Sequence, residues 1–106
     1  MSRSQRDKGK RGERYAVQLL QPVYPDARRS ANQAGGAVQP DVDGTPFWVE
    51  SKTGKSIGLW VALKQAQEDR AAAKDPRPIL LYLRRDRTEP VVVMLASEWL
   101  EECCKR

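Results

Sequence analysis

The chain has 106 residues and a net charge of +5, with 40% hydrophobic and 31% charged residues; this length allows one domain, and the composition does not indicate disorder. Its only two cysteines, Cys103 and Cys104, are adjacent and histidine is absent, which excludes a disulfide framework, a Cys/His zinc site and every nucleophile pair that needs histidine. No apolar run reaches the roughly 18 residues of a membrane span and no secretory signal is recognisable, so we expect a soluble, intracellular protein.

Positive charge is concentrated at the N-terminus. We expect one domain over residues 1–106, with residues 1–8 as a basic arm. Such an arm suits the phosphate backbone of a nucleic acid, but a solvated terminus that only aids solubility explains the charge equally well. The basic residues of this region are Arg3, Arg6, Lys8, Lys10, Arg11 and Arg14, against Asp7 and Glu13.

A first helix is predicted over residues 9–21, ended by Pro22. Glu13 borders the face of this helix that should turn inward, which is an unusual place for an acid. The residues predicted to face inward are Gly12, Ala16, Leu19, Leu20 and Val23.

The polar segment 26–37 reads as a short strand that leads into a loop containing Gly35 and Gly36. Residues 38–53 follow as two strand-like runs separated by Asp43-Gly44-Thr45-Pro46. Because Asp-Gly is a strong turn signal, we predict a β-hairpin here.

A second helix is predicted over residues 61–74, and residues 57–61 either extend the sheet or lead into that helix. Two buried strands follow over residues 77–85 and 89–95, and then a short helix capped by Ser97 that turns Trp99, Leu100 and Cys103 inward. Phe47, Trp60 and Trp99 are expected in the core. The order α-β-β-β-α-β-β-α predicts an α/β fold with a mixed central sheet flanked by helices.

Alternation along the strand that contains Glu50 places Trp48, Glu50 and Lys52 on one face. A turn of two or four residues pairs Asp41 with Pro46 or Trp48, and either register puts Asp41 on the same face as Glu50. Two facing carboxylates would repel each other without a cation, so a hard cation such as Mg²⁺ explains the pair. Lys52 would then orient or deprotonate the attacking water or stabilise the phosphate, and Trp48 would line the DNA groove.

Each of these residues also has a simpler interpretation. Asp41 suits a turn, and Glu50 and Lys52 suit the solvated face of an edge strand. Lys55 lies in a loop beside the predicted site, where it either touches backbone phosphate or is merely solvated. The run Thr53-Gly54-Lys55-Ser56 is not a nucleotide-binding loop, because that motif needs glycine where Val49 stands.

The sequence Pro40-Asp41, followed by Glu50-Ser51-Lys52, resembles the PD-(D/E)xK motif of restriction-endonuclease-like nucleases. The segment from Lys8-Gly9 to Glu13-Arg14 is similar to the KGxxxER opening of the archaeal Holliday junction resolvases of that superfamily. Arg29 and Ser30 resemble the Arg and Ser ahead of the family's catalytic aspartate. Gln65 resembles the glutamine that follows the ExK strand, although Gln67 competes for that assignment.

This resemblance covers residues 6–100 and implies a restriction-endonuclease-like fold. It also implies a metal site made by Glu13, Asp41, Glu50 and the Ser51 carbonyl, with Mg²⁺ as the cofactor and Mn²⁺ as a substitute. The chain departs from the family in its shorter C-terminal part and in Gly35-Gly36 of the loop.

The activity implied by the resemblance is that of a homodimeric Holliday junction resolvase that cuts four-way DNA junctions. Its compact form would suit a bacteriophage, with the protein then in the cytoplasm of the host cell. Two alternatives stay open: another PD-(D/E)xK nicking, restriction or repair nuclease, and a DNA-binding module without activity. The predicted DNA contacts are Arg3, Arg6, Lys8, Lys10, Arg11, Arg14, Arg29, Ser30 and Lys55.

Overall fold

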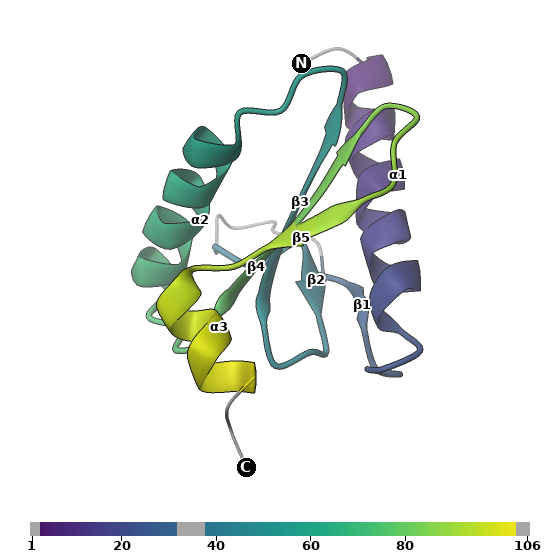
Figure 1. Cartoon of the computed structure of the whole chain (residues 1–106). Helices are drawn as coiled ribbons and strands as arrows, with labels where there is room; N and C mark the ends of the chain where they lie inside the picture. The colour runs from purple at the N-terminus through teal and green to yellow at the C-terminus, as the bar shows by residue number, and fades with distance from the viewer. Residues whose placement is uncertain (1–2, 32–37, 104–106) are drawn as a thin grey trace.

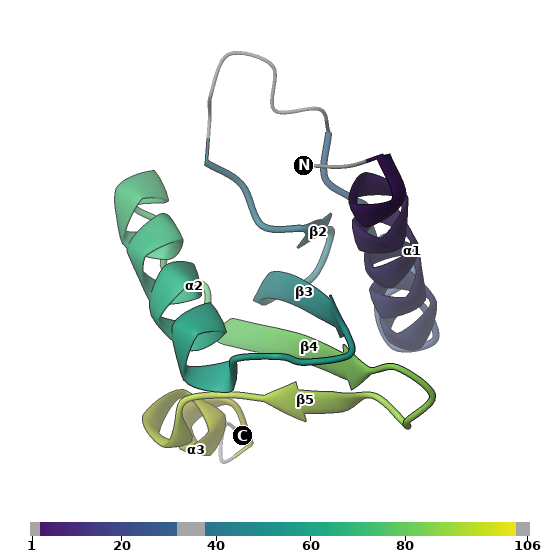
Figure 2. The ribbon, with the colours of Figure 1, turned by 90° about the horizontal axis from the view of Figure 1, so that it is seen from above.

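A single five-stranded sheet organises the chain, and helices cover both of its faces (Figures 1 and 2). The computed structural model describes residues 3–31 and 38–103, and side chains from residue 9 onward within those ranges. The elements, in chain order, are α1 (Arg3–Leu20), β1 (Arg28–Arg29), β2 (Val42–Asp43), β3 (Trp48–Gly54), α2 (Leu59–Ala73), β4 (Ile79–Arg85), β5 (Val91–Val93) and α3 (Ala96–Cys103).

The sheet has the order β1-β2-β3-β4-β5, in which only β3 and β4 pair in parallel. Parallel neighbours need a crossover, and α2 supplies it. The predicted mixed α/β class is therefore confirmed. Among the described residues, no helix is long and apolar enough to cross a membrane.

Two hydrophobic clusters hold the layers together, one on each face of the sheet. Alternation along β3 sends Val49 into the cluster under α1 and Trp48 into the cluster under α2. In β4, every residue from Ile79 to Leu83 is buried, as expected for a central strand covered on both faces. The site therefore rests on β3, a strand that is fixed from both sides.

The structure corrects the N-terminal prediction. α1 begins at Arg3, so residues 3–8 belong to the first helix, which was predicted to begin at residue 9. Arg, Gln and Lys are good helix formers, and a helix already anchored by Ala16 and Leu20 can extend through them. The side chains of Arg3, Arg6 and Lys8 lie outside the described part of the structure, as do Gly35, Gly36 and Cys104.

Several apolar residues predicted to face inward are exposed instead. Leu19 of α1 is 46% exposed, because the buried residues of this helix are Gly12, Ala16 and Leu20, and Val23, in the turn after the helix, is 69% exposed. Trp60 lies on the outer side of α2 and is 77% exposed. Phe47, predicted in the core, is partly buried against the cluster under α1.

The predicted inward face of α3 is also wrong. Trp99 and Leu100 are about half exposed and Cys103 is exposed. The reason is that α3 is attached through a polar residue, since Glu98 accepts a hydrogen bond from the Ile79 N–H at 3.0 Å and pairs with Arg70 of α2.

The turn between β2 and β3 depends on Gly44. Its φ is +81°, and a Cβ atom there would lie 2.1 Å from the Asp26 carbonyl oxygen. Gly44→Ala should therefore lower the free energy of unfolding by about 3 kcal/mol or more, measured by urea denaturation. Gly9→Ala is the matched control, because nothing lies within 4 Å of that site and alanine should stabilise α1 by about 1 kcal/mol. Equal stability of Gly44→Ala and the unmodified chain would refute the turn geometry.

Candidate active site

Asp41 and Glu50 lie side by side where β2 meets β3. The Asp41 N–H donates to the Val49 carbonyl at 2.8 Å, and the Ser51 N–H donates to Asp41 Oδ2 at 2.8 Å. The observed register pairs Val42 with Val49, which brings Asp41 opposite Glu50 and corrects the predicted pairing with Pro46 or Trp48. The observed register differs from either predicted register by an even number of residues. Asp41 and Glu50 therefore share a face of the sheet, as expected.

Glu50 is buried, with 9% of its surface exposed, and its carboxyl oxygen Oε1 accepts a hydrogen bond from Trp48 Nε1–H at 2.9 Å. Trp48 itself is only 1% exposed, so it does not line a DNA groove as predicted. A buried indole N–H needs an acceptor, and Glu50 supplies it. Trp48 therefore fixes the orientation of the Glu50 carboxyl group.

Without a bound cation, ionisation of both Asp41 and Glu50 is unfavourable. Burial first, and then the charge of the neighbouring Asp41 carboxylate, raise the pKa of Glu50 to about 8. Burial also raises the pKa of Asp41, although the Ser51 N–H and the charge of Lys52 oppose the shift. The pair therefore retains a proton near neutral pH unless a cation compensates its charge.

Glu13 approaches the pair from α1. Burial raises the pKa of Glu13 first, the charge of Asp41 raises it further, and the Arg29 side chain lowers it. Arg29 Nε donates to Glu13 Oε1 at 3.0 Å, so these two predicted site residues form an ion pair with each other. Glu13 is therefore near Asp41 but is held by a cationic partner.

Three carboxylates are not assembled into one cluster here. Within residues 3–31 and 38–103, no group of three or more Asp, Glu or Cys side chains is arranged to hold a metal ion. The predicted set of Glu13, Asp41 and Glu50 would need Glu13 to leave Arg29 and turn toward the pair. Asp41 and Glu50 already occupy adjacent positions.

The lack of a side chain at Gly12 lets α1 lie close to β3, which brings Glu13 near Asp41. The helix passes so close to β3 that a Cβ atom on Gly12 would lie 2.7 Å from Thr53 Cγ2 and 3.2 Å from Ser51 Oγ. Such an approach is possible only without a side chain. Gly12 was predicted to face inward, but its contribution to the site was not predicted.

Lys52 and Gln65, predicted to act together, line one cavity of about 400 Å³ between β3 and the start of α2. Lys52 is exposed there and Gln65 Nε2 donates to Asp69 Oδ1 at 2.9 Å. Asp69 was not predicted, yet its charge raises the pKa of both Asp41 and Glu50. Its spacing of four residues from Gln65 on one helix was the available signal.

Ser30 holds the segment before Asp41 in place. Its hydroxyl group donates to the Pro40 carbonyl, and its backbone N–H donates to the Asp41 carbonyl at 3.1 Å. The side chain predicted to contact DNA thus positions Asp41.

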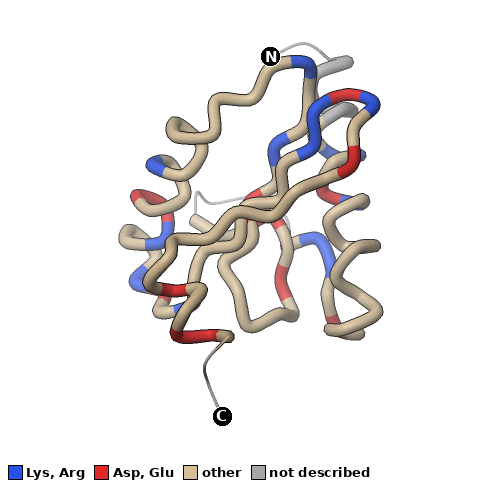
Figure 3. Tube along the Cα trace, in the orientation of Figure 1, with Lys and Arg blue, Asp and Glu red and all other residues tan. Residues whose placement is uncertain are grey.

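The remaining predicted DNA contacts with described side chains, Lys10, Arg11, Arg14 and Lys55, are exposed. In Figure 3, Lys and Arg gather near the end of the molecule where β3 and β4 terminate.

The chain matches no protein-family model, and no curated protein and no solved structure matches it. Its chemistry is therefore inferred from its own residues.

Proposed function

We propose that the chain is a metal-dependent endodeoxyribonuclease of the restriction-endonuclease-like class. The observation that carries this proposal is the adjacent pair of Asp41, which is half-buried, and Glu50, which is buried, beside Lys52. Two adjacent acids with raised pKa values lower the stability of the fold, and no described cationic side chain forms an ion pair with either of them. An arrangement of this kind is typical of a functional site.

The donor atoms of the pair suit a hard divalent cation. Carboxylate and carbonyl oxygens are the ligands that Mg²⁺ accepts, and Mn²⁺ accepts the same set. Asp41, Glu50 and the Ser51 carbonyl would hold the ion. Glu13 would become a further ligand when its carboxylate leaves Arg29 and turns toward the ion. When bound, the ion would activate a water molecule and neutralise charge on the phosphate.

The other residues act on the substrate. Lys52 would meet the scissile phosphate, where it would either orient or deprotonate water or stabilise the developing negative charge. Gln65, on the wall of the same cavity, offers an amide group to the water or to a phosphate oxygen. Trp48 keeps the Glu50 carboxyl group fixed throughout.

The preferred substrate under this proposal is a four-way DNA junction, which needs two symmetric nicks. A cleavage assay on a junction, a linear duplex and a single strand, each with and without Mg²⁺, tests it. Cleavage of the junction first, and only with the metal, is the expected result. Equal cleavage of junction and duplex would favour another nuclease of the same class, and binding without cleavage in any condition would favour a non-catalytic DNA-binding module.

A homodimer is also proposed, since two identical subunits supply two active sites related by symmetry. Of the two predicted interfaces, the strand from Ile79 to Leu83 is excluded because it is buried inside the sheet. The surface formed by β5 and α3 is exposed and apolar, and β5 is an edge strand with an open backbone. Its exposed residues are Val91, Val92, Trp99 and Leu100.

Trp99→Glu should therefore convert a dimer into a monomer, because it places a charge on this apolar surface. Sedimentation at micromolar concentration measures the change. Trp60→Glu is the matched control, since Trp60 is more exposed but lies on α2, away from β5. A monomeric unmodified chain, or a dimer that survives Trp99→Glu, would contradict the interface.

A further inference from the structure

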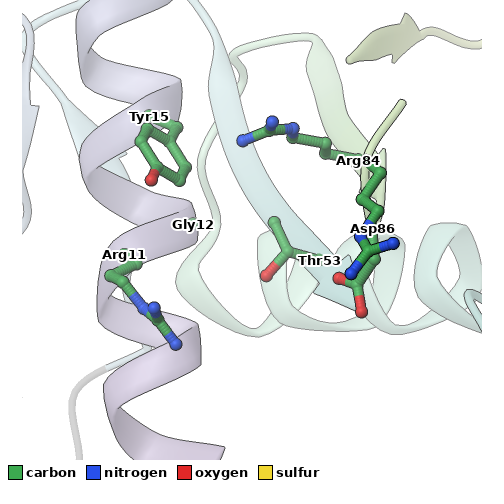
Figure 4. A pocket seen from close by; sticks show the side chains of 7 residues that line it. Arg11, Gly12, Tyr15, Thr53, Arg84 and Asp86 are labelled. Carbon is green, nitrogen blue, oxygen red and sulfur yellow. The ribbon is translucent and has the colours of Figure 1, made fainter. Parts of the chain in front are cut away.

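A second cavity, of about 320 Å³, lies between α1 and the ends of β3 and β4 (Figure 4). Its walls include Arg11 and Tyr15 of α1, Thr53 of β3, Arg84 near the end of β4, and Arg87 in the β4–β5 turn. Alternation along β3 directs Thr53 toward α1 and Lys52 toward α2. Thr53 also lines the cavity that holds Lys52 and Gln65, so the two cavities adjoin at the end of β3, with Lys52 in one and the arginines in the other.

The guanidinium group of Arg84 is held in place before any ligand arrives. Its Cζ atom lies 5.1 Å from the centroid of the Tyr15 ring, and its Nε donates to the Thr88 carbonyl at 3.2 Å. An arginine stacked on an aromatic ring and fixed at Nε keeps its terminal nitrogens available. Those nitrogens have the geometry that binds phosphate oxygens.

Arg87 adopts a backbone conformation that arginine disfavours. Its φ is +64°, in a turn closed by the hydrogen bond from the Thr88 N–H to the Arg85 carbonyl at 3.0 Å. Glycine or asparagine would occupy this position at lower cost, by about 1 kcal/mol. A charged residue kept at a strained position on the wall of a cavity points to a function for its side chain.

The charge of the cavity favours an anion. Three arginines line it, against one carboxylate, Asp86. Within the described part of the chain, Arg11 and Arg87 form no ion pair. A phosphate group in this cavity would satisfy several guanidinium donors at once.

We propose that this cavity binds a backbone phosphate of the DNA, away from the scissile phosphate. The inference deepens the proposed nuclease function and rests on it for the identity of the ligand. The DNA strand would then contact both sides of the end of β3, with Lys52 on one side and Arg84 and Arg87 on the other. This second contact would orient the strand relative to Asp41 and Glu50.

The test measures binding of fluorescent duplex and junction DNA by anisotropy in EDTA, so that no cleavage is needed. Arg87→Gly should weaken binding about five- to tenfold and reduce the slope of log K against log salt by about one, without lowering the melting temperature. Arg84→Met should weaken binding similarly. Lys74→Gly is the matched control, because Lys74 also has a positive φ, 54°, but caps the far end of α2.

Unchanged affinity of Arg87→Gly, or an equal loss in Lys74→Gly, would overturn the inference. Inorganic phosphate should compete with DNA more strongly than chloride at equal ionic strength, and this excess should disappear in Arg87→Gly. If phosphate binds at Arg87 while DNA affinity is unaffected by the substitution, the ligand is a small phosphate compound and the DNA contact is refuted. Intact, Arg87-dependent binding by a chain that never cleaves DNA would refute the nuclease and leave this site standing.

Discussion

Glu50→Gln is expected to stabilise the metal-free protein at alkaline pH. The pKa of Glu50 is raised from 4.5 to about 8, so the folded state disfavours the ionised form. The stability that Glu50 contributes is complete below pH 4.5, declines as the pH rises to about 8, and stays low above it. Glutamine carries no charge and keeps an oxygen for Trp48 Nε1–H, so the gain above pH 8 should be on the order of a few kcal/mol.

Urea denaturation in EDTA at about pH 5 and about pH 9 measures this difference. Glu68→Gln is the matched control, because Glu68 is exposed on α2 and its replacement should leave the pH dependence unchanged. If Glu50→Gln destabilises the protein at both pH values, the Glu50 carboxylate is a structural partner and not a group kept for a ligand.

Lys52→Met is expected to lower the rate of single-turnover cleavage by about 10² to 10⁴, because under the proposed function it removes a positive charge beside the scissile phosphate. Stability should stay within about 0.5 kcal/mol, since Lys52 is exposed. Lys64→Met, an exposed lysine of α2, is the matched control and should cleave normally. Equal rates for the two variants would remove Lys52 from the active site.

It was predictable that Asp41, Glu50 and Lys52 share one face of the sheet, because alternation along a strand depends only on local sequence. The exact register was not predictable; in the turn, Thr45 Oγ1 accepts a hydrogen bond from the Phe47 N–H at 3.1 Å, and the observed register pairs Val42 with Val49. A side-chain contact of this kind competes with the Asp-Gly signal and is not visible in the order of residues.

Contacts between distant segments were the least predictable part of the site. The Glu13 and Arg29 ion pair joins residues 16 positions apart, and whether such residues meet depends on how α1 lies on the sheet. The close approach of α1 at Gly12 decides this. The influence of Asp69 likewise depends on the packing of α2.

The exposure of Trp60 and Trp99 shows a second limit. Hydrophobicity predicts that a side chain prefers an apolar environment, but it does not identify the surface that provides it. For Trp99 the proposed surface belongs to a second subunit. At the N-terminus, the basic composition drew attention away from helix propensity. The helix α1 begins at Arg3, earlier than predicted.

The central claim, that Asp41 and Glu50 form a metal-dependent site for phosphodiester hydrolysis, is tested most directly by one cleavage assay. The rate of junction cleavage is measured for the unmodified chain with Mg²⁺, for the same chain with EDTA, and for Asp41→Asn and Glu50→Gln with Mg²⁺. DNA binding is checked in each case by anisotropy. The account predicts cleavage only by the unmodified chain with Mg²⁺, while all variants bind DNA. Cleavage in EDTA, near-normal cleavage by either variant, or no cleavage by the unmodified chain would contradict it.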